Sequence, residues 1–127
     1  MTGWDPAATA LVELLPRTAR GPRRDGIFAL WLTTRVAQDL AAEAPAAERS
    51  HRRRVAALGQ RLSSLAVAPP LRRALAAALA ELAAGTSADA ARILSQLIAP
   101  ARETAGPEAA DALALAARAA RPGRSHG

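Results

Sequence analysis

The chain has 127 residues, 36 of them alanine and 17 leucine, and its 17 strongly basic residues are all arginine, which gives a formal net charge of +6. Its length is that of one ordinary domain, and the alanine and leucine content predicts helices because both residues are strong helix formers. The absence of cysteine excludes disulfides, thiolate nucleophiles and cysteine-ligated metal centres.

The first predicted helix begins at Asp5-Pro6, where an N-cap acceptor precedes a proline at the first helical position. Its apolar residues are leucines and a valine between positions 11 and 15. The helix is expected to end near Arg20, because Gly21-Pro22 is a typical helix-ending pair.

The second predicted helix runs from about Gly26 to Ala44, with Asp25 as its cap. Large apolar side chains recur along it at i+4 spacing, in a stripe made of Phe28, Leu32, Val36 and Leu40, which Ile27 and Trp31 widen and behind which Leu30 lies. A helix that is apolar over so much of its circumference is usually central, so we expect it to form the core. Arg35 and Asp39, four residues apart, are predicted to pair on its narrow polar strip.

Further start and stop signals predict four more helices, over about 45–67, 69–85, 89–99 and 107–120. Their boundaries are marked by prolines and glycines, and Pro100 is expected either to kink the fifth helix or to end it near Ala99. The connections are short, which predicts that consecutive helices are antiparallel neighbours.

We therefore predict an all-α fold, a compact bundle of five to six short, alanine- and leucine-rich antiparallel helices. It forms a single domain over residues 1–120, followed by a flexible tail over 121–127. No stretch approaches the roughly 20 apolar residues of a membrane span, and no charged leader precedes an apolar run at the N-terminus. The expected compartment is the cytoplasm.

The sequence offers little for catalysis or cofactor binding. It contains no Gly-x-Ser-x-Gly elbow, no Gly-x-Gly-x-x-Gly pattern and no phosphate loop. Glu48 and His51 have the spacing of one di-iron ligand pair, but no second copy follows, so we expect His51 to pack at the edge of the bundle. We predict no catalytic residues, no metal ligands and no cofactor; an enzyme would need a charged site assembled across helices.

Arginine is the residue type that points most directly to binding, because its planar guanidinium donates paired hydrogen bonds to carboxylates and phosphates. The candidate anion- or partner-binding residues are Arg49, Arg52, Arg53, Arg54, Arg72 and Arg73. The first four crowd the start of the third helix, where they oppose the helix dipole, a local cost that a bound anion or an acidic partner would offset. Codon bias towards arginine, with these side chains on a solvated face, is the alternative explanation.

Residues 62–75 read LSSLAVAPPLRRAL, a pattern that resembles the turn and recognition helix of helix-turn-helix proteins. The resemblance implies that Arg72 and Arg73 face phosphates or base edges. The segment departs from the pattern at Ala66, where the turn usually carries glycine, and no strand pair for a wing follows it.

These observations favour a non-catalytic helical interaction or scaffold module, which binds a macromolecular partner through its arginine-rich surface or a spare apolar face. The expected partner is another protein, including one with an acidic surface, or a second copy of the chain. Residues 26–32 are apolar enough to bind a partner if part of them is exposed. The alternative is a small basic DNA- or RNA-binding protein with a degenerate helix-turn-helix-like segment at 55–75, whose affinity should fall with salt.

Overall fold

The computed structural model describes residues 4–42, 48–85 and 87–120, and most of these residues are helical, with no β-strand among them. They form seven α-helices: α1 (Trp4–Leu14), α2 (Pro22–Ala41), α3 (Glu48–Ser63), α4 (Pro69–Ala84), α5 (Ala90–Ser95), α6 (Ile98–Ala105) and α7 (Pro107–Ala119). Two 3-10 turns, η1 (Leu15–Arg17) and η3 (Ser87–Asp89), follow α1 and precede α5. The predicted all-α bundle is confirmed, while the predicted tail and the predicted boundary at 44–45 lie outside the described residues.

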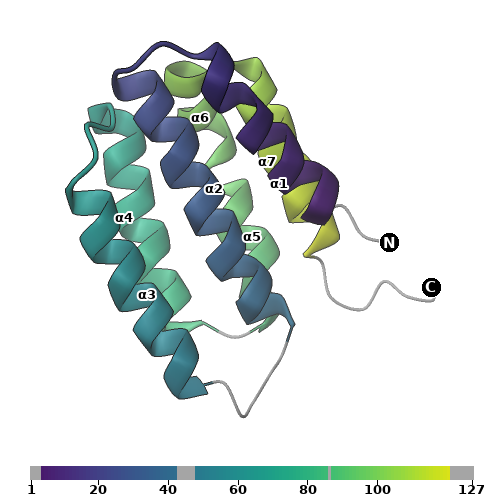
Figure 1. Cartoon of the computed structure of the whole chain (residues 1–127). Helices are drawn as coiled ribbons and strands as arrows, with labels where there is room; N and C mark the ends of the chain where they lie inside the picture. Colours follow the sequence, from purple (N-terminus) through teal and green to yellow (C-terminus); the bar gives the residue numbers. More distant parts are fainter. Residues whose placement is uncertain (1–3, 43–47, 86, 121–127) are drawn as a thin grey trace.

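The helix α2 is central, since it contacts each of the other six α-helices. Figure 1 shows α3 and α4 on one side of α2, and α1 packed along α7 on the other. Both α5 and α6 contact α2 and α7, and they lie behind α2 in this view. The prediction that the second helix forms the centre of the bundle is therefore confirmed.

The face of α2 that enters the core differs from the predicted stripe. Its most deeply buried side chains are Ile27, Ala29, Leu30, Thr33, Thr34 and Ala37. Of the predicted stripe only Val36 is buried, whereas Phe28, Leu32 and Leu40 are half-buried. Because α2 is apolar on two sides, its periodicity alone does not determine which side faces the core.

The start of α2 also corrects the prediction. The helix begins at Pro22, after Gly21 at a φ of +144°, and not at Gly26. Proline suits this first position because its missing N–H would have no partner there. Asp25 lies in the first turn and caps nothing; its Oδ2 accepts a hydrogen bond of 2.8 Å from the N–H of Ala66, which ties α2 to the connection between α3 and α4.

The predicted fifth helix is interrupted before Pro100, at Gln96 and Leu97, and this break separates α5 from α6. The ring of Pro100 would clash with the carbonyl group of Gln96 in a continuous helix, and proline has no N–H to donate to it. In the structure Pro100 falls in the first turn of α6, where neither problem arises. With α5 and α6 taken as one interrupted helix, the described residues form six helices, within the predicted five to six.

Charge is unevenly distributed among the helices. Together α3 and α4 contain seven arginines and two acidic residues, whereas α5, α6 and α7 contain three of each. The helix α1 contains two acidic residues and no arginine. Most of the positive charge therefore belongs to the α3–α4 pair. None of the described helices has both the length and the apolarity needed to cross a bilayer.

Candidate interaction groove

The predicted arginine group on α3 does not converge on one point. Arg52, Arg53 and Arg54 are exposed and follow one another in the N-terminal half of α3. Successive residues of an α-helix point about 100° apart, so the three side chains leave α3 in three directions. Arg54 is turned towards α2, where its Nη1 donates to Asp39 Oδ2 at 3.1 Å. Arg49 lies in the first turn of α3, and its side chain is outside the described part of the structure.

The second predicted group, Arg72 and Arg73, is exposed near the start of α4, beside the C-terminal end of α3. The Nη2 of Arg72 donates to the carbonyl oxygens of Val67 at 3.1 Å and Leu65 at 3.4 Å. Arg72 therefore stabilises the connection between α3 and α4. The structure does not join this pair of arginines to Arg52, Arg53 and Arg54, so the five predicted residues whose side chains are described form no single site.

The helices α3 and α4 form an antiparallel pair rather than a helix-turn-helix (Figure 1). Near the start of α3, the Nε2 of the half-buried His51 donates to the carbonyl oxygen of Leu82 near the end of α4, at 2.9 Å. Further along, Gly59 lies against Leu79. The two helices stay side by side along their length, whereas those of a helix-turn-helix cross at about 90–120°. The resemblance of residues 62–75 to that motif is therefore wrong in its geometry.

The exposed side of α2 and the adjoining side of α3 enclose an open groove of about 530 Å³, which we call the α2–α3 groove. Its lining residues are Phe28, Trp31, Leu32, Arg35, Val36, Asp39, Arg54, Ala57, Leu58 and Arg61. Three of them are arginines and one is an aspartate, so the groove combines an apolar surface with an excess of positive charge.

Two aromatic rings occupy the α2 side of the groove. Phe28 and Trp31 are half-buried, and their ring centroids lie 6.0 Å apart with an angle of 23° between the ring planes. The guanidinium of Arg35 lies over Trp31, and that of Arg61 reaches from α3 over Phe28, each 5.3 Å from the ring centroid. Cation–π attraction thus holds two arginines over the aromatic surface of α2.

Sequence reasoning identified Arg54 and the apolar segment 26–32, but it did not place Arg35, Asp39 and Arg61 beside them in one groove. The predicted pair between Arg35 and Asp39 is wrong, because Asp39 bonds to Arg54 across the groove and Arg35 stacks on Trp31. One signal was present in the sequence: Arg54 and Arg61 are seven residues apart, which is about two turns and places them on one side of α3. That side faces α2, which only the packing reveals.

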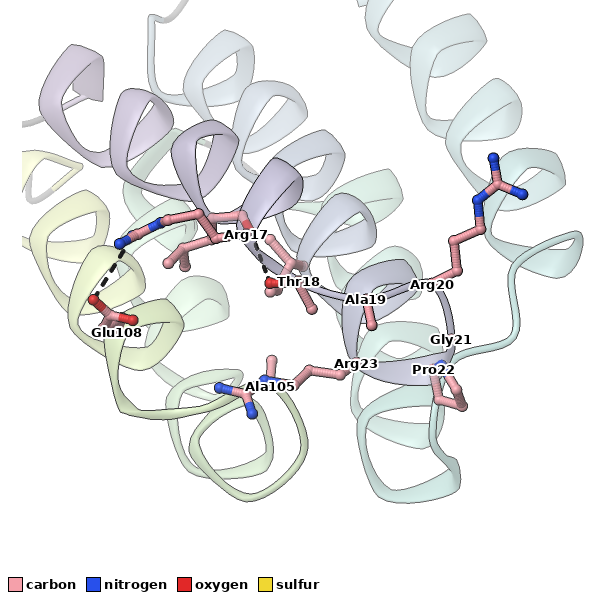
Figure 2. A pocket seen from close by; sticks show the side chains of 11 residues that line it. Arg17, Thr18, Ala19, Arg20, Gly21, Pro22, Arg23, Ala105 and Glu108 are labelled. Atoms are coloured by element: carbon pink, nitrogen blue, oxygen red, sulfur yellow. Dashed lines mark hydrogen bonds and ion pairs between the residues drawn. The ribbon is translucent and has the colours of Figure 1, made fainter.

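A second cavity, of about 540 Å³, lies at the turn between α1 and α2 (Figure 2). Figure 2 shows Arg17 and Arg23 extending towards the junction of α6 and α7, and Arg20 extending the opposite way. Arg17 lies 3.9 Å from the carboxylate of Glu108, and Arg23 packs against Gly106, whose φ is +100°. These contacts join the α1–α2 turn to the start of α7, and the three arginines do not converge on one anion.

Another charged cluster, at the junction of α4 and α5, is also structural. Arg92 donates from Nη1 to Glu81 and from Nη2 to Asp89 Oδ1 at 3.3 Å. The hydrogen bond to Glu81, followed by that to Asp89, raises the pKa of Arg92 above its ordinary value, so this side chain stays charged. No group of three or more potential metal ligands occurs within the described parts of the chain.

Comparison with known proteins identifies no function for this chain, so the candidate site is chosen from the geometry of the structure. The chain matches no known protein family, and no curated protein or solved structure is significantly similar to it. The α2–α3 groove is the candidate site, because it joins aromatic surface and uncompensated arginine charge on the same pair of helices.

Proposed function

We propose that this protein is a non-catalytic helical interaction module that binds an acidic protein partner through the α2–α3 groove, acting in the cytoplasm. One observation carries the proposal: Phe28 and Trp31 lie on the side of α2 that faces away from the core, beneath the guanidinium groups of Arg35 and Arg61. Tryptophan and arginine are enriched among the few residues that dominate protein–protein binding energies.

The two aromatic rings are available for binding because the opposite side of α2 already fills the core. Leu30 and Ile27 are fully buried there, whereas Phe28 and Trp31 remain half-buried. Covering the rest of each ring removes roughly 50–90 Å² of apolar surface from water at most, which contributes about 1–2 kcal/mol per ring. Each ring therefore has enough unused surface to change an affinity many-fold.

The charge around the groove favours an acidic partner. Only Asp39 opposes the three arginines that line it. Guanidinium groups bind carboxylates through paired, charge-assisted hydrogen bonds. Five further arginines on α3 and α4 extend this positive potential beyond the groove, which speeds encounter with acidic proteins and selects against basic ones.

The proposal is tested by photo-crosslinking from two positions in cells that produce the protein. A photoreactive residue replaces Ala57, which lines the groove, or Ala77, which is exposed on α4 outside it. We expect a discrete protein adduct from position 57 and none from position 77. The change Arg61→Gln should reduce the adduct at least about fivefold, because it removes the cation over Phe28, whereas Arg73→Gln, outside the groove, should leave it unchanged.

An adduct that forms equally from both positions, or that survives Arg61→Gln, would contradict the proposal. The absence of any adduct from position 57 would contradict it as well. An adduct that is destroyed by nuclease and resists protease would instead support the nucleic-acid alternative.

That alternative is favoured by one specific observation, the seven arginines carried by α3 and α4. It requires binding through the outer surface of this antiparallel pair and not through a recognition helix. Duplex DNA and RNA should then bind with an affinity that falls steeply between low and physiological salt, in proportion to the number of phosphates contacted. Binding that is absent even at low salt would exclude it.

A further inference from the structure

The α2–α3 groove has the length of a short helix. It extends from the Asp39–Arg54 pair at one end to Phe28 and Arg61 at the other. Phe28 and Asp39 are about three helical turns apart along α2, which corresponds to roughly 16 Å. A partner segment that contacts the whole groove therefore needs about three turns of helix or a shorter extended peptide.

The walls of the groove favour the helix over the extended peptide. Both α2 and α3 are regular α-helices there, so their backbone groups bond within each helix and offer none to a partner. An extended segment would bury some of its own backbone groups unpaired against the apolar surface, at about 1–3 kcal/mol each. A helix satisfies its backbone internally and can pack onto two antiparallel helices as the helices of the bundle pack on one another.

Positive charge lies on both walls of the groove, which determines where the partner should be acidic. Arg35 comes from α2, and Arg54 and Arg61 come from α3. A helix seated between them meets arginine on both sides of its apolar stripe. A second copy of this chain fits poorly, because α3 alone contains five arginines and one glutamate, and two such faces would repel each other.

We infer that the α2–α3 groove binds an acidic amphipathic α-helix of about three turns, with carboxylates on both sides of its apolar stripe. This inference rests on the proposed function and names the element that the partner supplies. Asp39, the one carboxylate lining the groove, occupies Arg54 in the free protein. A carboxylate of the partner competes with Asp39 for Arg54, so Asp39 weakens binding and restricts it to strongly acidic helices.

The inference is tested by selection from a displayed library of helical peptides of about 14 residues, long enough for three turns, with randomised side chains. The baits are the wild-type chain, the charge-reversed double variant Arg54→Glu/Arg61→Glu, and Arg73→Glu as a matched control outside the groove. We expect the wild type and the control to enrich peptides with apolar residues at i, i+4 and i+7, flanked by Asp and Glu. The double variant should enrich Lys and Arg at the flanking positions. Circular dichroism checks that all three baits are equally helical.

The outcomes separate this inference from the proposed function. Enriched peptides without acidic residues, or the same acidic preference on all three baits, would overturn the acidic-helix inference. The affinity of those enriched peptides for the Phe28→Ala variant is then compared with their affinity for the wild type. If Phe28→Ala binds them at least about tenfold more weakly, the groove remains a protein-binding site. If no peptide is enriched, the inference fails, and the crosslinking from position 57 decides on the proposed function.

Asp39 provides an independent readout. The change Asp39→Asn removes the charge that holds Arg54, and we expect it to tighten binding of an enriched acidic peptide about two- to fivefold, in line with the strength of an exposed ion pair. Asp111→Asn, an exposed acidic residue on α7, should leave the affinity unchanged. Fluorescence of Trp31 reports binding, with the buried Trp4 as a constant background. Unchanged or weaker binding by Asp39→Asn would overturn the competition by Asp39.

Discussion

Thr33 and Thr34 are adjacent polar residues in the middle of α2, and each is only 1% exposed. The hydroxyl of Thr33 donates to the carbonyl oxygen of Ala29 at 2.8 Å. The hydroxyl of Thr34 is buried without a partner among the described residues. A buried hydroxyl that has lost its bonds to water and gained none costs about 1–3 kcal/mol. At the scale of the residue, these two neighbours should therefore contribute differently to stability.

We predict that Thr34→Val raises the free energy of unfolding by about 1 kcal/mol, because a methyl group of similar shape replaces an unsatisfied hydroxyl. Thr33→Val is the matched control, since it removes a hydroxyl that is already bonded and should lower the free energy of unfolding by about 0.5–1 kcal/mol. Urea denaturation followed by circular dichroism measures both. A Thr34→Val variant that is less stable than Thr33→Val would contradict this prediction, because it would mean that the hydroxyl of Thr34 has a hydrogen-bond partner in the folded protein.

At the scale of the element, the connection between α3 and α4 depends on side chains from other helices. Arg72 bonds to two of its carbonyl groups, and Asp25 of α2 accepts a hydrogen bond from the N–H of Ala66 within it. The prolines at the start of α4 supply no N–H groups of their own to stabilise the turn. Arg72 was predicted to bind a partner, and in the fold it binds this connection.

We predict that Arg72→Ala lowers the free energy of unfolding by about 1 kcal/mol, because it leaves the carbonyl groups of Val67 and Leu65 without this donor. Arg73→Ala, at the next and also exposed position of α4, should change it by less than about 0.5 kcal/mol. Thermal unfolding of the two variants, measured side by side, distinguishes the roles. Equal effects would mean that the bonds of Arg72 do not contribute to stability.

At the scale of the whole molecule, α2 contributes one side to the core and the other side to the α2–α3 groove. One side is surrounded by the other helices, while the other side forms the α2–α3 groove. Leu30 and Leu32 are two residues apart on this helix and therefore lie on different sides of it. Leu30 is fully buried in the core and Leu32 is half-buried in the groove.

We predict that Leu30→Ala lowers the free energy of unfolding by about 3 kcal/mol, because it leaves a cavity in the core that the bundle cannot fill. Leu32→Ala removes the same atoms from a half-buried position and should cost about 1 kcal/mol. Denaturant titration measures the two values. A larger loss for Leu32→Ala would mean that the originally predicted stripe faces the core after all.

Much of the site depends on contacts between helices that no pattern within one helix contains. The sequence identified arginine as the binding residue and 26–32 as a segment suited to a partner, and it placed Arg54 among the candidates. It did not reveal that Arg61 lies over Phe28, or that Asp39 bonds to Arg54 and not to Arg35. Those contacts join residues 15 to 33 positions apart, beyond the reach of any i, i+4 rule.

The sequence by itself determined the elements: alanine and leucine favour helices, and prolines and glycines mark where each helix can begin or end. Periodicity also determined which residues share a side of a helix. Only the tertiary structure decided which of the two apolar sides of α2 enters the core. The physical reason is that burial depends on the surfaces that neighbouring helices present, and here they enclose Leu30 with two threonines and leave Phe28 and Trp31 half-buried in the groove.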